Sequence, residues 1–405
     1  MGHKKGEETM NWLLRGTLPA ALLAIGTAGA MAEPGITDDK IILGAVDPLT
    51  GPPSLLGKAH SLALKVWQED VNARGGINGR KVEIVFEDDG YVPARALQAL
   101  KKMVEVDDIF GLIGTSGSSQ LAAMMPLINE LGIPTLNNMA VNSHHFDPPL
   151  NPLFVVGPTY CQEIGAGMTY LVEELGLKDE KYAIAFQDDE FGDDVRCGYL
   201  AGIEKYGLNN VLEIKFKRGQ KDFSAEMLRA RAAGVNVLVS GGVVAEHSTL
   251  MKEAAKNRMD ITFLGAHSAH LTPVQALAES AGDGYYAADY VPPLTALEVP
   301  GVAKFMGLAN TYLSDAERDS LNRYSLAGYA GALIFEHAMA ECGTDLTRAC
   351  VIDKLEGLDG FETGGLLGPV TYGKGNRHAP TAVTVVQSNA KDKSFSIVSE
   401  RMEVE

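Results

Sequence analysis

Short apolar runs alternate with longer amphipathic stretches along most of the chain. The runs have the continuous apolar character of strands that are buried on both faces, whereas the longer stretches carry apolar residues at helical spacing. In the first part of the chain the predicted strands are 40–46, 82–86, 109–113 and 134–136, and the predicted helices are 58–72, 92–106 and a stretch through 131. Such alternation predicts a parallel sheet covered by helices on both faces.

The same alternation restarts after Pro158. The second set consists of predicted strands at 182–186, 211–215, 235–240 and 263–264, and of helices at 163–175, 193–206, 224–233 and 247–257. A third segment adds helices at 301–312, 325–342 and 347–355, and a strand pair around 371 and 381–387. We therefore expect an α/β fold with two lobes, each built on a parallel sheet.

The N-terminus has the order of charged, apolar and small residues that is typical of a secretory signal peptide. Lys4, Lys5 and Arg15 are basic, 18–30 is apolar, and Ala30-Met31-Ala32 fits the cleavage rule. The sequence predicts a signal peptide at 1–32, cleavage after Ala32 and a mature protein in the periplasm. Translation starts at either Met1 or Met10, since a more typical basic region begins at Met10.

Composition narrows the possible partners. The chain has 405 residues, 46% hydrophobic and 21% charged residues and a formal net charge of −17. This length favours two domains. An acidic protein repels phosphate backbones and anionic lipid surfaces, so we expect neither nucleic acid nor a membrane surface to be its main partner.

Export changes how the cysteines are interpreted, because disulfides persist in an oxidising compartment. The chain has four cysteines and no C-x-x-C motif, so a redox or zinc-ribbon site has no support. Cys342 and Cys350 are close in sequence and are predicted to form a disulfide. Cys161 and Cys197 are then left to pair with each other, or to stay as buried free thiols.

No sequence motif indicates catalysis, a cofactor or a metal site. The turn at 114–118 lacks the final glycine of G-x-S-x-G, and there is no Walker A or complete G-x-G-x-x-G motif. The pairs His144-His145 and His267/His270 lack an identifiable carboxylate partner at metal-binding spacing. We expect a protein that is not an enzyme and needs neither cofactor nor metal.

Several motifs occur in the order found in the periplasmic binding proteins of the leucine/isoleucine/valine family, which this chain resembles over nearly all of its predicted mature length. These are the turn at 48–52, D-V-N-A-R-G-G-I-N-G-R at 70–80, the Asp pair at 88–89, I-G-T-S-G-S-S at 113–119, G-I-P at 132–134, D-D-E-F-G at 188–192, K-D-F-S at 221–224, G-G at 241–242 and G-P-V-T-Y at 368–372.

The resemblance implies a type I periplasmic binding protein, with two Rossmann-like lobes joined by three crossover strands and a solute bound between them. It implies lobe 1 at 33–157 and 288–367, and lobe 2 at 158–287 and 368–405. The expected partners are a small-molecule ligand and an inner-membrane ABC permease, and the expected state is a monomer that closes around its ligand. A sensory domain that reports ligand to a signalling partner would use the same hinge closure.

Departures from the family's pattern suggest an unusual ligand. In amino-acid-binding relatives, a second-lobe acid pairs with the ligand ammonium, but that position is His267 here, and the position of a ligand-binding threonine is Val141. A buried ammonium without a carboxylate is costly, so a largely apolar solute such as an aromatic acid or a sterol-like lipid is expected. An amino acid remains the alternative if Glu246 or Asp289 supplies the acid. The predicted ligand-binding residues are Leu56, Ser116, Ser118, Ser119, Met139, Ala140, Val141, Phe191, Val243 and His267.

Overall fold

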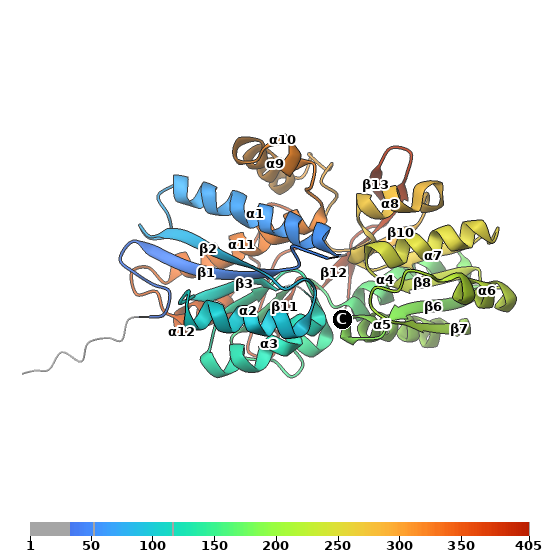
Figure 1. Ribbon diagram of the computed structural model, residues 1–405, viewed down its shortest axis with the longest axis horizontal. Coiled ribbons are helices and arrows are strands. Elements are labelled where there is room, and N and C mark those ends of the chain that lie inside the picture. Colours follow the sequence, from blue (N-terminus) through green and yellow to red (C-terminus); the bar gives the residue numbers. More distant parts are fainter. Residues whose placement is uncertain (1–32, 52, 116, 405) are drawn as a thin grey trace, which may run out of the picture. The chain divides into compact units, whose positions relative to one another are not determined.

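The structure contains two separate β-sheets, each with mainly parallel strands (Figure 1). It is a computed structural model that describes residues 33–51, 53–115 and 117–404, so the predicted signal peptide lies outside the described residues. The first sheet has six strands in the order β11-β5-β4-β3-β1-β2. Its strands are β1 (Lys40–Asp47), β2 (Lys81–Asp88), β3 (Gly111–Thr115), β4 (Thr135–Asn137), β5 (Leu153–Val156) and β11 (His378–Ala379).

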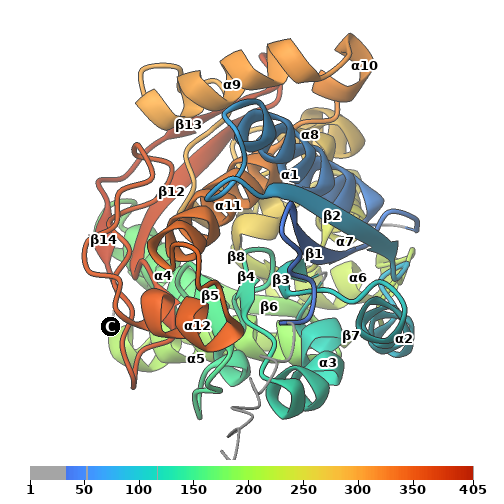
Figure 2. The ribbon, with the colours of Figure 1, turned by 90° about the vertical axis from the view of Figure 1, so that its left-hand side faces the viewer.

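Helices cover both faces of this first sheet, and successive strand residues point to opposite faces. Leu43 and Ile113 pack in the cluster that includes residues of α1 and α11, while Val46 and Leu112 pack with α2 and α3. Figure 2 looks toward this lobe, with α1 and α11 on one side of the strands. The helices of this lobe are α1 (Ser54–Ala73), α2 (Pro93–Glu105), α3 (Ser118–Leu131), α9 (Pro300–Tyr312), α10 (Asp315–Arg318), α11 (Arg323–Glu341) and α12 (Arg348–Glu356).

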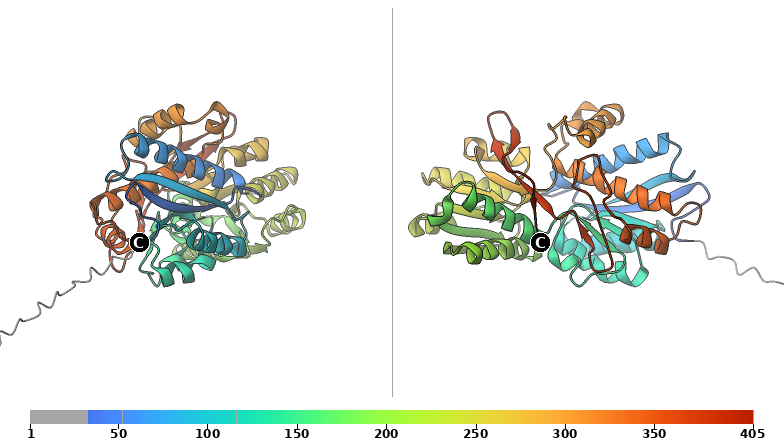
Figure 3. Two further views of the ribbon diagram at one scale, coloured as in Figure 1. Left: turned by 60° about the vertical axis from the view of Figure 1, so that its left-hand side comes forward. Right: turned by 180° about the vertical axis from the view of Figure 1, so that it is seen from behind.

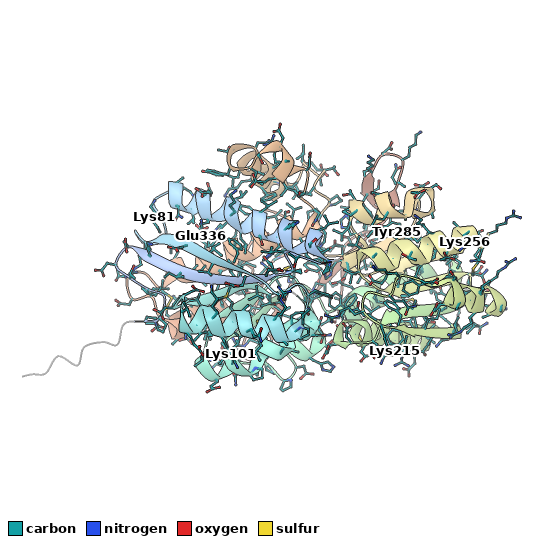
Figure 4. All side chains as sticks on the ribbon, viewed as in Figure 1. Lys81, Lys101, Lys215, Lys256, Tyr285 and Glu336 are labelled. Carbon is teal, nitrogen blue, oxygen red and sulfur yellow. A yellow bond between two sulfur atoms is a disulfide. The ribbon has the colours of Figure 1, made fainter. Side chains whose placement is uncertain are left out.

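The second sheet has eight strands, seven of them in the order β13-β12-β10-β9-β8-β6-β7, with β14 paired to β12. Val237 and Val239 pack in the cluster with α4 and α5, and Leu238 between them packs with α6 and α7. The strands are β6 (Lys181–Gln187), β7 (Asn209–Phe216), β8 (Val237–Gly241), β9 (Thr262–Gly265), β10 (Tyr286–Asp289), β12 (Ala382–Asn389), β13 (Ser394–Ile397) and β14 (Met402–Glu403). Lys215 and Lys256 lie on the outer side of this lobe (Figure 4).

The helices of the second lobe are α4 (Tyr160–Glu173), α5 (Glu190–Tyr206), α6 (Ser224–Ala233), α7 (Val244–Lys256) and α8 (Thr272–Ala278). Short 3-10 turns occur at Ser143–His145, Leu177–Asp179, His267–Ala269 and Glu279–Gly282. The predicted two-lobed α/β fold is therefore confirmed. The sequence did not predict α8, α10, β11, β13 or β14, which are short and carry little periodic signal. The strand expected around 371 is not formed, since Val370 makes only an isolated bridge to Phe361.

The chain crosses between the two sheets after β5, after β10 and between β11 and β12. Seen from behind, the C-terminal red segment runs between the lobes (Figure 3). Gly157 follows β5 with φ +121°, and a Cβ there would lie 2.6 Å from the Tyr290 ring. Only glycine fits this position, because the first two crossings pack directly against each other.

Strand pairing corrects two of the expected lobe boundaries. β10 stays in the second sheet through Asp289, beyond the boundary expected at 288. β11 pairs with β5, so the chain stays with the first sheet through Ala379 rather than leaving it at 368. The motif at 368–372 does not mark the lobe boundary, because Val370 pairs locally with Phe361 and enters neither sheet.

Both predicted disulfides are present. Cys161 and Cys197 join α4 to α5 with a Cα–Cα distance of 5.1 Å. Cys342 and Cys350 join the end of α11 to α12 with a Cα–Cα distance of 6.0 Å. Free thiols are thereby excluded for Cys161 and Cys197.

Buried His247 makes stability depend on pH. It lies on α7 with 4% of its surface exposed, and burial lowers its pKa to about 3. The unfolded chain binds a proton near pH 6.5 and the folded chain does not, so stability is lost as pH falls below about 6.5. We expect His247→Leu to reduce the slope of unfolding free energy between pH 6 and pH 4.5 by about 1.4 kcal/mol per pH unit. Urea denaturation at several pH values measures it.

The control for this change is Met251→Leu, which keeps the volume of a buried side chain on the same helix. It should leave the slope as in the wild type. If His247→Leu and Met251→Leu give the same slope, His247 takes up a proton in the folded protein and the prediction is wrong.

Candidate functional site

The N-terminus of α3 offers unpaired hydrogen-bond donors at the boundary between the lobes. Its N-cap is Gly117, in an extended conformation, and among residues 117–404 no side-chain cap hydrogen bond is made there. The first N–H groups of a helix have no intrahelical partner and carry partial positive charge. Ser118 is 3% exposed, and its Oγ has no hydrogen-bond partner among the described residues. This turn can receive a carboxylate or hydroxyl oxygen.

Ser118 lines a cavity between the two lobes, which we call the central cavity. As the lobes stand, its free room is only about 20 Å³, enough for about one water molecule, within about 340 Å³ of space that includes the opening to solvent, so a larger solute requires the lobes to part. First-lobe residues face second-lobe residues across it, so a solute bound there would contact both. The lining residues are Leu56, Tyr91, Gly117, Ser118, Met139, Tyr160, Phe191, Val243, Ser268 and Tyr324.

Aromatic rings dominate the second-lobe wall of the central cavity. The Tyr160 ring meets the Phe191 ring edge-on at 4.7 Å between centroids and stacks on His267 at 5.0 Å. Tyr160 begins α4 directly after its capping box at Thr159, and Phe191 lies in the first turn of α5. Both helix starts therefore present a flat apolar surface to a solute.

Behind these rings, His267 pairs with an acid. Its Nδ1 lies 2.8 Å from Glu163 Oε1, and its backbone N–H donates to Glu163 Oε2 at 2.9 Å. Burial raises the pKa of Glu163, although contact with His267 acts in the opposite direction. Both carboxylate oxygens of Glu163 thus bind His267, and Glu163 does not line the central cavity.

Asp289 also forms ion pairs with neighbouring side chains. Arg323 donates from Nε and Nη2 to its two oxygens at 2.9 and 2.7 Å, and His270 Nδ1 lies 2.6 Å from Oδ2. Burial acts to raise the pKa of Asp289, but Arg323 and His270 hold it well below its ordinary value. This fully buried carboxylate is ionised and already paired.

Polar contacts between the lobes close one side of the cleft. Arg218, between β7 and α6, donates from Nη1 to the Tyr91 carbonyl at 2.9 Å and from Nη2 to Ser119 Oγ at 3.1 Å. Its guanidinium lies over the Tyr91 ring at 4.3 Å and also pairs with Asp189. Glu190 accepts a hydrogen bond from Ser119. Arg218 therefore joins a second-lobe loop to two segments of the first lobe.

The structure brings half of the predicted ligand-binding residues together in the central cavity: Leu56, Ser118, Met139, Phe191 and Val243. Ser116 lies outside the described residues. The other four predicted residues do not line the central cavity. Ser119 bonds across the lobes to Glu190 and Arg218, and His267 lies behind Tyr160. Ala140 and Val141 are buried and line none of the cavity, and their carbonyls accept from Asn137 and Tyr160 respectively.

Sequence reasoning missed the other five lining residues, which are Tyr91, Gly117, Tyr160, Ser268 and Tyr324. Tyr91 and Tyr160 follow the ends of strands β2 and β5, where ligands bind in open α/β sheets, so their position was a usable signal. Tyr324 had no such signal, since it follows the N-cap of α11 and comes from a distant part of the chain.

Among the described residues, no cluster of three or more His, Cys, Asp or Glu side chains is placed to hold a metal ion. Within 33–51, 53–115 and 117–404, none of the helices combines the length and apolar character needed to cross a bilayer.

Comparison with known proteins identifies the family. The model of the periplasmic binding protein family matches residues 40–393, so the chain belongs to this family. It is a substrate-binding protein of the ABC-transporter type, with the type I fold of the leucine/isoleucine/valine-binding proteins. The family is periplasmic, and its members are substrate-binding proteins rather than enzymes.

Individual relatives are distant. An "Amino acid binding protein" of Pseudomonas aeruginosa is 27% identical over 60% of this chain and 64% of its own length. The Brucella suis "Leu/Ile/Val-binding protein homolog 7" is 23% identical over 78% of this chain and 81% of its own length. The match thus spans less than two thirds of the Pseudomonas protein.

Solved structures share the fold at low identity. A branched-chain amino acid ABC transporter protein from Thermus thermophilus with bound valine has a TM-score of 0.82 and 21% identity, covering 91% of this chain and 97% of its own. A fatty acid ABC transporter substrate-binding protein from Thermomonospora curvata has a TM-score of 0.80 and 24% identity, covering 92% and 95%. These values establish the fold and leave the ligand open.

Proposed function

We propose that this protein captures a small, largely apolar solute bearing one carboxylate or hydroxyl group, and delivers it to an inner-membrane ABC permease when the lobes close. The observation that carries the proposal is the composition of the central cavity. Its described lining is aliphatic, aromatic or glycine, apart from the hydroxyls of Ser118, Ser268 and the tyrosines, and includes no acid. The proposed cellular site is the periplasm, after cleavage of the signal peptide at Ala32.

A free amino acid fits this cavity poorly, because its ammonium needs an anionic partner when it is buried. Asp289, one candidate acid, holds Arg323 and His270. Glu246, the other, accepts from the backbone N–H groups of Gly219 and Val243 at 3.2 and 3.3 Å. Neither lines the central cavity.

The proposed binding mode places the oxygen of the solute at the α3 turn. Ser118 Oγ and the free N–H groups of that turn receive it, and the apolar body packs between Tyr160, Phe191 and Tyr324. The Thermomonospora curvata protein, named for fatty acid transport, supports the view that this fold accommodates apolar carboxylates.

Calorimetry against benzoate, 4-hydroxybenzoate, octanoate, a sterol, leucine and valine tests the proposal. We expect at least one of the apolar compounds to bind with micromolar affinity, and leucine and valine to bind more weakly than it. Micromolar binding of leucine with none of the apolar compounds would overturn the proposal.

Ser118→Ala tests the head-group contact. We expect it to weaken binding of the best apolar carboxylate about tenfold, because a hydrogen bond to a charged group contributes roughly 1.5 kcal/mol. The matched control is Ser396→Ala, an exposed serine on β13 that lines neither lobe boundary nor cavity. Equal affinities for the two variants would show that Ser118 does not bind the solute.

A further inference from the structure

A second chamber borders the central cavity, and we call it the outer chamber. It comprises about 610 Å³ of space, including its opening to solvent. Tyr91 and Val243 line both the outer chamber and the central cavity, so the two spaces adjoin at these side chains. The lining residues are Pro53, Gly90, Tyr91, Val92, Gln187, Arg218, Gly219, Val243, Val244, Ala245 and Glu246.

The charged side chains of the outer chamber are already engaged. Arg218 donates to the Tyr91 carbonyl and to Ser119, and pairs with Asp189. Glu246 accepts from the N–H groups of Gly219 and Val243, and burial raises its pKa. These groups have partners within the protein, so a polar ligand group would have to displace them.

Apart from Gln187, whose buried Oε1 has no hydrogen-bond partner among the described residues, and the Tyr91 hydroxyl, the rest of the lining is apolar and comes from both lobes. Pro53 and Val92 belong to the first lobe, and Val243, Val244 and Ala245 belong to the second. Val92 in this lining is 42% exposed. An apolar group in this chamber would cover such exposed surface.

We infer that the solute is elongated, with a polar head in the central cavity and a flexible apolar chain that passes Tyr91 and Val243 into the outer chamber. This inference rests on the proposed function and extends it: the ligand class becomes a linear monocarboxylate rather than a compact aromatic acid. An apolar chain attached to a head at Ser118 would use both spaces, because the two charged side chains that line the outer chamber, Arg218 and Glu246, already have partners.

The prediction concerns how affinity grows with chain length. Each methylene group removed from water adds up to about fourfold in affinity. For the wild-type protein we expect dodecanoate, used below its micelle concentration, to bind at least about 100-fold more tightly than butanoate. Ala245→Trp should reduce this ratio at least tenfold, because an indole at the exposed Ala245 would fill the chamber.

Calorimetry with butanoate, octanoate and dodecanoate measures the ratio within each variant, so a general change in stability cancels. The matched control is Ala255→Trp, the same substitution at an exposed alanine of the same helix that lines neither chamber. It should keep the wild-type ratio.

Three results would contradict the inference, and they separate it from the proposed function. If Ala245→Trp keeps the wild-type ratio, long chains bind elsewhere. If benzoate binds but the ratio is near one in the wild type, the inference fails and the proposed function stands. If benzoate, 4-hydroxybenzoate, the sterol and all the linear acids fail to bind, the proposed function fails with it.

Discussion

Arg323→Met is expected to destabilise the folded protein by about 3–5 kcal/mol, because removing one member of a buried ion pair leaves the other charge without a partner. Asp289 is fully buried and receives two hydrogen bonds from Arg323 at 2.9 and 2.7 Å. The guanidinium also lies 4.8 Å from the centroids of both the Tyr290 and Tyr324 rings, so packing is lost as well. Urea denaturation at pH 7 without solute measures the change.

The exposed Arg229 on α6 provides the matched control, and Arg229→Met should change stability by less than about 0.5 kcal/mol. The pH dependence offers a second readout. The pKa of Asp289 is lowered in the folded state, so its contribution is fully present above the unfolded value near 3.9 and is lost only as pH falls through the folded value. In the wild type this contribution should therefore stay constant from pH 8 to pH 5, whereas in Arg323→Met the buried Asp289 has lost the partner that lowers its pKa, so the difference between the two proteins should shrink as pH falls. A cost equal to that of Arg229→Met would contradict the pairing.

Arg218→Met is expected to weaken solute binding about 100-fold, or roughly 2.7 kcal/mol, without comparable loss of stability. Arg218 bonds to Tyr91 and Ser119 of the opposite lobe, and these contacts exist only when the lobes are together. Losing them disfavours the closed state, and apparent affinity falls with the population of that state.

Solution scattering gives the structural readout for this variant. In the wild type, saturating solute should reduce the radius of gyration, and in Arg218→Met the same reduction should require about 100-fold more solute. Arg231→Met, an exposed arginine on α6, is the control. An unchanged radius in the wild type at saturation would exclude lobe closure, and wild-type affinity in Arg218→Met would exclude Arg218 as a closing contact.

Most of the architecture could be predicted from local patterns, because buried parallel strands and amphipathic helices have different apolar spacing. Strand β3 and helix α11 fall close to their predicted ranges. The lobe boundary near the C-terminus could not be found this way. β11 spans only His378–Ala379, and its membership in the first sheet depends on pairing with β5, more than 200 residues earlier.

Residues of the candidate site could be predicted only where the residue type and its place near a helix start or after a strand were both informative. Apolar residues near helix starts and after strands, such as Leu56, Met139 and Val243, lie in the cavity as predicted, and their binding role remains a prediction. His267 did not reach it, because it pairs with Glu163, 104 residues away in sequence. No local pattern reveals that Tyr160, which stacks on His267, lies between His267 and the cavity.

The most direct test of the central claim compares leucine with 4-methylpentanoate, which is leucine without its ammonium group. The two compounds share the carboxylate and the branched apolar chain, so calorimetry on the same sample isolates the contribution of the charge. The central cavity has no acid among its described lining residues. We therefore predict that 4-methylpentanoate binds at least about tenfold more tightly than leucine, since a buried unpaired ammonium is costly. Tighter binding of leucine would contradict the account.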